Sequence, residues 1–173
     1  IRKVASEFGI KDLKLDELFR VEGSISVVEE SFYEGLDTGS FSVFDIWTRL
    51  VEQQNVLENL CPYDSFLSSW QTILSPIEEV IDLYLSLQRK FPLVLISNGD
   101  SEGVRHFIKR LYSEYGLAFV KVFISAEYKR KKPKLFGDVF AFLLDSNVLP
   151  SDCVFVDDLL PYVEAAQQLG VPA

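Results

Sequence analysis

Residues 93–100 read LVLISNGD, and this stretch decides the expected fold. A continuous apolar run that follows Pro92 and ends in polar residues is typical of a buried parallel strand that leads into a loop. Apolar residues then recur at helical spacing over 104–115, and further short apolar runs at 120–125 and 153–156 are separated by another helical pattern. This alternation predicts βαβ units and a parallel sheet in the second part of the chain.

The first part of the chain has a different pattern. Apolar residues repeat at helical spacing in four segments, roughly 16–33, 42–54, 63–72 and 76–89, and none of these segments has the pattern of a strand. We therefore expect a mostly helical domain over residues 1–75 and an α/β core over residues 76–173.

Composition narrows the class of function. The 173 residues are 48% hydrophobic, which is enough to build a core, and the net charge of -9 argues against a nucleic-acid or anionic-membrane partner. No apolar stretch approaches the roughly 20 residues that cross a bilayer. Cys61 and Cys153 are far apart and outside any CxxC spacing, so we expect neither a zinc site nor a disulfide. These features predict a cytoplasmic protein that acts on a small molecule.

The ends of the chain also suggest an interpretation. The sequence contains no Met and begins at Ile1, and it stops shortly after a helical pattern that closes on Gly170. We therefore expect a core that is incomplete at both ends.

Polar residues follow each expected strand, at the edge of a parallel sheet where ligands bind. They are Ser97-Asn98, the basic loop 129–132, and the adjacent pair Asp157-Asp158. Mg²⁺ is typically held by one or two carboxylates, several waters and a substrate phosphate, so the acidic pair suits this ion. The plainer alternative is that two Asp residues end a strand and begin a turn. A hydroxyl and an amide that bind phosphate oxygens, a lysine and a carboxylate pair together favour phosphoryl transfer.

The order of Ser97-Asn98, Lys132-Pro133 and Asp157-Asp158 resembles the haloacid dehalogenase (HAD) superfamily of hydrolases. This resemblance implies a Rossmann-like α/β core with an inserted all-helical cap of the C1 type. It implies that Ser97 and Lys132 are catalytic, and that these two residues and Asn98 bind phosphate. It also implies that Asp157 and Asp158 hold Mg²⁺.

The sequence departs from the family pattern in two places. The nucleophile motif DxDx[TV] does not occur in these residues, so the family layout places the nucleophile strand ahead of Ile1. Tyr162 stands where the family usually has a further Asp or Asn, four residues after Asp158.

The resemblance implies a Mg²⁺-dependent phosphatase that acts on small phosphorylated metabolites through an aspartyl-phosphate, with this chain alone inactive. A haloacid dehalogenase is an alternative, but that reaction needs no metal, and the acidic pair argues against it. A non-catalytic HAD-like binding protein is a further alternative, because of Tyr162 and the absent nucleophile. His106, the single histidine, lies in a helical pattern beside apolar positions, and we expect no catalytic role for it.

Overall fold

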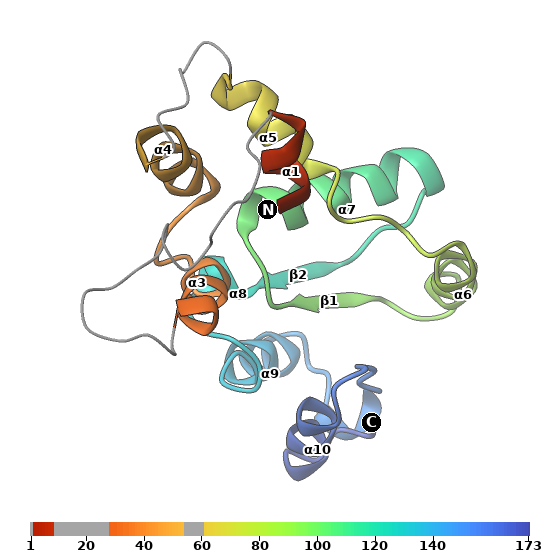
Figure 1. Ribbon diagram of the computed structural model, residues 1–173. Helices are drawn as coiled ribbons and strands as arrows, with labels where there is room; N and C mark the ends of the chain where they lie inside the picture. Colours follow the sequence, from red (N-terminus) through yellow and green to blue (C-terminus); the bar gives the residue numbers. More distant parts are fainter. Residues whose placement is uncertain (1, 9–27, 54–60) are drawn as a thin grey trace. The chain divides into compact units, whose positions relative to one another are not determined.

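The computed structural model describes residues 2–8, 28–53 and 61–173. The described residues belong to two compact units, one within residues 1–129 and one of residues 130–173, and each is described by itself. Unit 1 contains a group of helices and a parallel βαβ element, and unit 2 is built from helices and extended segments (Figure 1).

The helices of the first 75 residues enclose a core of their own. They are α1 (Arg2–Glu7), α3 (Val28–Asp37), α4 (Val43–Gln53) and α5 (Tyr63–Gln71). Side chains of α4 and α5 fill the core, among them Ile46, Leu50 and Phe66, which are fully buried. The indole N–H of Trp47 donates to the carbonyl oxygen of Cys61 at 2.7 Å, which satisfies the polar atom of a buried ring.

Local signals explain where two of these helices lie. Ser42 and Asp45 form a capping box at the start of α4, in which the Asp45 carboxylate accepts the Ser42 N–H at 2.7 Å and the Ser42 hydroxyl accepts the Asp45 N–H at 3.3 Å. The helices predicted at 42–54 and 63–72 are confirmed to within one residue at each end. Residues 16–27 of the first predicted helix lie outside the described residues, and the described part continues to Asp37.

The rest of unit 1 is the predicted βαβ element. Its members are α6 (Glu78–Gln88), β1 (Val94–Ser97), α7 (Ser101–Tyr115), β2 (Lys121–Ile124) and the short α8 (Ser125–Tyr128). The two strands are parallel, with Val94 opposite Lys121 and Ser97 opposite Ile124 (Figure 1). The predicted α/β class with a parallel sheet is therefore confirmed. Helix α6 begins two residues after Pro76, later than its pattern predicts.

Helix α7 packs against the sheet and sets the position of the loop after β1. Val104 of α7 and Ile124 of β2 belong to one buried cluster. The Asp100 carboxylate caps the start of the helix by accepting the Gly103 N–H at 2.7 Å. Gly116 ends the helix in the left-handed conformation, with φ of 73°.

Unit 2 contains α9 (Phe136–Asp145), the short 3₁₀ turn η2 (Pro150–Asp152) and α10 (Leu160–Gln168). The strand predicted at 153–156 is wrong for this unit, because the segment belongs to no sheet in the described residues. Within the described residues, the segment 153–156 is held by a backbone hydrogen bond from the Phe155 N–H to the Pro172 carbonyl at 2.8 Å. A strand needs a hydrogen-bonded neighbour, and the described residues of unit 2 provide no second strand.

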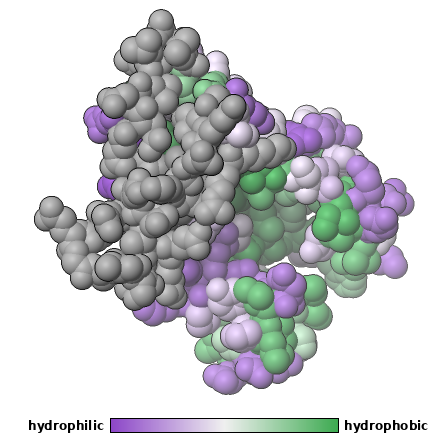
Figure 2. All heavy atoms as spheres, viewed as in Figure 1, coloured by the Kyte–Doolittle hydropathy of each residue, from purple (hydrophilic) through white to green (hydrophobic). Residues whose placement is uncertain are grey.

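The unpaired segment leaves apolar side chains in solvent. Val154 and Val156 are 76% and 75% exposed. Figure 2 shows further apolar surface over the part of the chain that forms α10, where Leu160 is also exposed. Across the described residues, every helix is too short or too polar to cross a membrane.

Candidate functional site

In unit 1, β1 ends at Ser97, and Asn98 and Gly99 follow in the loop after the strand. The Gly99 N–H donates to the hydroxyl oxygen of Ser125 at 3.0 Å. Ser125 is fully buried at the start of α8, directly after β2, so this hydrogen bond joins the ends of the two strands. Sequence reasoning missed Ser125, because a serine at the end of an apolar run looks like an ordinary loop residue.

Two acidic residues connect the start of α7 to the helices of the first 75 residues. Asp100 accepts a hydrogen bond from the indole N–H of Trp70 at 3.3 Å, and Glu102 accepts one from the backbone N–H of Val43 at 3.4 Å. Burial raises the pKa of the Glu102 carboxyl, and the nearby Asp100 raises it further, against the opposing effect of the hydrogen bond from Val43. The helical group is therefore fixed within unit 1 to the residues just after Ser97-Asn98-Gly99.

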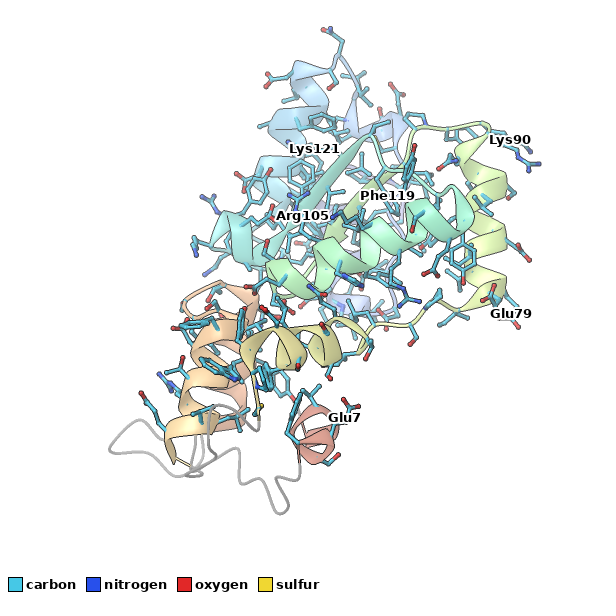
Figure 3. All side chains as sticks on the ribbon, turned by 90° about the horizontal axis from the view of Figure 1, so that it is seen from above. Glu7, Glu79, Lys90, Arg105, Phe119 and Lys121 are labelled. Atoms are coloured by element: carbon cyan, nitrogen blue, oxygen red, sulfur yellow. The ribbon has the colours of Figure 1, made fainter. Side chains whose placement is uncertain are left out.

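An ion pair between α7 and α8 connects the start of α7 to the helix that follows β2. Arg105, in the first turns of α7 (Figure 3), donates to both carboxylate oxygens of Glu127, at 2.8 and 2.6 Å. The Ser101 hydroxyl donates to the same carboxylate at 2.6 Å. The hydrogen bond from Arg105 is the main reason why the pKa of Glu127 lies below its usual value. His106 also lies on α7, and the absence of a catalytic role for it stays a prediction.

In unit 2, Lys132 and Asp157 form a nearly buried ion pair. The Lys132 ammonium donates to Asp157 Oδ2 at 2.5 Å, and the two side chains are only 10% and 8% exposed. The other oxygen, Oδ1, accepts the backbone N–H of Leu159 at 3.0 Å. Burial alone raises the pKa of Asp157, but the hydrogen bonds from Lys132 and Leu159 outweigh it, and the pKa lies below its usual value.

The ring of Tyr162 also faces this lysine. The Lys132 ammonium lies 4.9 Å from the centre of the Tyr162 ring, within the range of a cation–π contact. Lys132 is thus held between a carboxylate and an aromatic face, both from residues that lie at least 25 positions further along the chain.

The acidic pair provides two different environments. The Asp157 carboxylate faces Lys132, whereas Asp158 is exposed to solvent. Within the described residues, no group of three or more acidic, histidine or cysteine side chains has an arrangement that could hold a metal ion. Mg²⁺ needs only one or two protein carboxylates when waters and a substrate phosphate complete its shell, so this donor set fits that ion and does not fit a closed cage of protein ligands.

The structure brings some of the predicted site residues together. Lys132, Asp157 and the neighbouring Asp158 lie in unit 2, and Ser97 and Asn98 lie at the end of β1 in unit 1. Lys129, from the same basic loop as Lys132, belongs to unit 1, where its ammonium donates to the Gly39 carbonyl at 2.7 Å.

Comparisons with known proteins identify the fold. No family model matches the chain, and no curated protein matches it significantly. A wild-type HAD family enzyme from Bacteroides thetaiotaomicron, solved with magnesium and inorganic phosphate, is similar to 98% of this chain over 81% of its own length, with 20% identity and a TM-score of 0.70. A mutant of the same enzyme with the same ligands has a TM-score of 0.68 at 19% identity, over 99% of this chain and 82% of that one.

A second organism provides a further likeness. A predicted HAD-like family hydrolase from Porphyromonas gingivalis has 21% identity and a TM-score of 0.61, over 98% of this chain and 78% of its own. The chain therefore has the HAD-like fold, as the order of its sequence motifs implies.

Proposed function

We propose that this chain is the larger part of a Mg²⁺-dependent phosphatase that hydrolyses small phosphorylated metabolites in the cytoplasm. The observation that carries the proposal is the nearly buried Lys132–Asp157 pair with the exposed carboxylate of Asp158 directly beside it. A dianionic phosphate is bound by positive charge, which an ammonium and a metal ion held by a neighbouring carboxylate would both supply. The magnesium and phosphate bound by the HAD family enzyme from Bacteroides thetaiotaomicron support the same chemistry.

Each site residue has a distinct proposed role. Ser97 and Asn98 donate hydrogen bonds to phosphate oxygens from the end of β1. Lys132 binds another phosphate oxygen and stabilises the charge that spreads over the phosphoryl group in the transition state. Asp157 holds the Lys132 ammonium in place through its 2.5 Å contact, and Asp158 contributes the more exposed metal carboxylate, with Asp157 beside it.

The reaction needs a nucleophile that these residues do not contain. We place an Asp carboxylate ahead of Ile1, where one of its oxygens forms a bond to phosphorus as the bond to the substrate alcohol breaks. Water then hydrolyses the aspartyl-phosphate and releases inorganic phosphate. Bound Mg²⁺ supplies positive charge that offsets the repulsion between the carboxylate and the phosphate. Without the nucleophile segment, the 173-residue chain is inactive.

The helices of residues 1–75 are proposed to form a cap that selects the substrate. They enclose a separate apolar core. They also contact the start of α7 through Trp70 and Asp100, close to the loop that follows Ser97. A segment with its own core and a polar contact beside the phosphate loop suits a role in covering the substrate.

A non-catalytic HAD-like binding protein remains a second candidate. Tyr162 favours it, because a phenol is a poor replacement for the carboxylate or amide that usually completes the metal site at this position. A full-length protein that binds phosphate but lacks an Asp-x-Asp motif ahead of Ile1 would support this candidate.

The test is hydrolysis of a small phosphomonoester by the full-length protein, with Mg²⁺ and with a chelator. We expect turnover that depends on Mg²⁺ and falls by orders of magnitude in Ser97→Ala. Ser113→Ala is the matched control, because Ser113 is an exposed serine on α7 whose hydroxyl donates to the Arg110 carbonyl of its own helix at 3.3 Å. No turnover in the wild type, or equal turnover in both serine variants, would contradict the proposal.

A further inference from the structure

Tyr162 is the second of the two places where this chain departs from the pattern of the family that it resembles. It lies in the first turn of α10, four residues after Asp158. A carboxylate or amide at this position can bind a metal ion, whereas a neutral phenol is a weak ligand for Mg²⁺. The contact of Tyr162 with Lys132 indicates a different role.

Tyr162 contacts Lys132 through the face of its ring. The ammonium lies 4.9 Å from the centre of the ring, and the Lys132 side chain is only 10% exposed. The negative face of an aromatic ring attracts a cation, and this attraction strengthens when water is largely excluded. The ring therefore replaces part of the hydration that a nearly buried ammonium loses.

The ammonium of a lysine lies at the end of a flexible four-carbon side chain, so it needs more than one contact to stay in place. Asp157 restrains the ammonium at 2.5 Å, and Asp157 is itself restrained by the Leu159 N–H. The Tyr162 ring supplies a second, uncharged surface that restrains the ammonium and leaves its net charge unchanged. A second carboxylate at this place would neutralise the lysine more fully and weaken its attraction for a phosphate oxygen.

We propose that Tyr162 is a positioning residue, whose ring face together with Asp157 holds the Lys132 ammonium ready for a phosphoryl oxygen. The effect on catalysis rests on the proposed phosphatase function, but the Lys132–Tyr162 contact does not. Two other roles give different results in the tests below. The phenol oxygen could belong to the metal shell, or the ring could serve only to pack α10.

The contact is tested by NMR of the full-length protein without any substrate. The ring current of Tyr162 should shift the ε-methylene protons of Lys132 upfield, and Lys132→Arg identifies their signal. We expect Tyr162→Phe to keep the shift, because the ring face remains, and Tyr162→Leu or Tyr162→Met to abolish it. Tyr112→Leu is the control, because Tyr112 is 66% exposed on α7. A Lys132 signal that does not respond to loss of the Tyr162 ring would overturn the proposal.

The catalytic effect is tested by kinetics on the same variants. We expect Tyr162→Phe to match the wild type in kcat and in the Mg²⁺ concentration for half-maximal activity. Tyr162→Leu and Tyr162→Met should lower kcat about tenfold, with that Mg²⁺ concentration unchanged. A raised Mg²⁺ requirement in Tyr162→Phe would show the phenol oxygen in the metal shell and overturn the positioning role. A wild type without phosphatase activity would refute the proposed function, while the NMR result would still decide the contact.

Discussion

Lys132→Met should destabilise unit 2 strongly at neutral pH and only weakly in acid. The variant removes the ammonium but keeps an apolar side chain of similar length. The Asp157 side chain, which is only 8% exposed, is then left without its cation. Breaking a buried pair by removing one partner costs about 3–5 kcal/mol. Asp157 keeps the hydrogen bond from the Leu159 N–H, so we expect a loss of stability at the lower end of this range, about 3 kcal/mol at pH 7.

The pH dependence follows from the direction in which the Asp157 pKa is shifted in each of the two proteins. In the wild type this pKa lies below its usual value of 3.8, so the pair contributes stability above that pH and loses it as the pH falls through the folded-state pKa. In Lys132→Met the raising effect of burial is no longer opposed by the lysine. The carboxyl then contributes stability in acid and loses it as the pH rises through its raised pKa. The difference between the two proteins should therefore shrink as the pH falls from 7 to about 3.

Hydrogen exchange of the full-length protein, followed in peptides that cover residues 150–165, is the suitable assay. Both tryptophans, Trp47 and Trp70, lie in unit 1, so amide exchange within residues 150–165 is the direct measurement on unit 2. A loss of about 3 kcal/mol corresponds to roughly a hundredfold lower protection at the Leu159 amide, if exchange there requires the pair to open.

The matched control is Arg130→Met, in the same unit. Arg130 lies 3.5 Å from Asp138 and its side chain is 52% exposed, so this change should cost at most about 1 kcal/mol. A Lys132→Met loss no larger than that of the control, or one that stays constant from pH 7 to about pH 3, would refute the reasoning.

Two further predictions concern unit 1. Glu127→Gln should lower the free energy of unfolding by about 0.5–1 kcal/mol at pH 7, because it weakens the partly exposed pair with Arg105. Since the pKa of Glu127 lies below its usual 4.5, that contribution is present above pH 4.5 and disappears as the pH falls through the folded-state value; urea unfolding followed by tryptophan fluorescence measures it. Ser125→Ala should leave the Gly99 N–H without its acceptor and cost about 1–3 kcal/mol. The Gly99 amide should then exchange faster with solvent than in Ser113→Ala, and unchanged exchange would contradict the role assigned to Ser125.

The βαβ element could be predicted because its signals are local. The apolar run before Ser97, the helical spacing after Asp100 and the apolar run that ends at Ile124 each reflect burial on one side of a single element. The strand predicted at 153–156 failed because a strand also needs a neighbour, and the residues themselves do not specify one. Its exposed Val154 and Val156 show how an apolar pattern can be present without the pairing that it suggests.

The candidate site was predictable in its residue types but not in its contacts. The positions of Lys132 and the acidic pair follow from their places after apolar runs. The identity of the lysine's partner does not, because Lys132 and Asp157 meet across 25 residues of chain. Tyr162 appeared in the sequence only as a departure from a pattern, and its contact with Lys132 is a tertiary feature. Glu102 and Ser125 gave no sequence signal, since their roles depend on burial against other elements.

The proposed phosphatase activity depends most on a metal-assisted phosphate site at Asp158. The most direct measurement is the Mg²⁺ dependence of phosphomonoester hydrolysis by the full-length protein and by Asp158→Asn, with Asp145→Asn as a control at the exposed end of α9. We predict Mg²⁺-dependent turnover in the wild type and the control, and turnover lower by orders of magnitude in Asp158→Asn. Hydrolysis that is indifferent to Mg²⁺, or an Asp158→Asn variant as active as the wild type, would contradict the account.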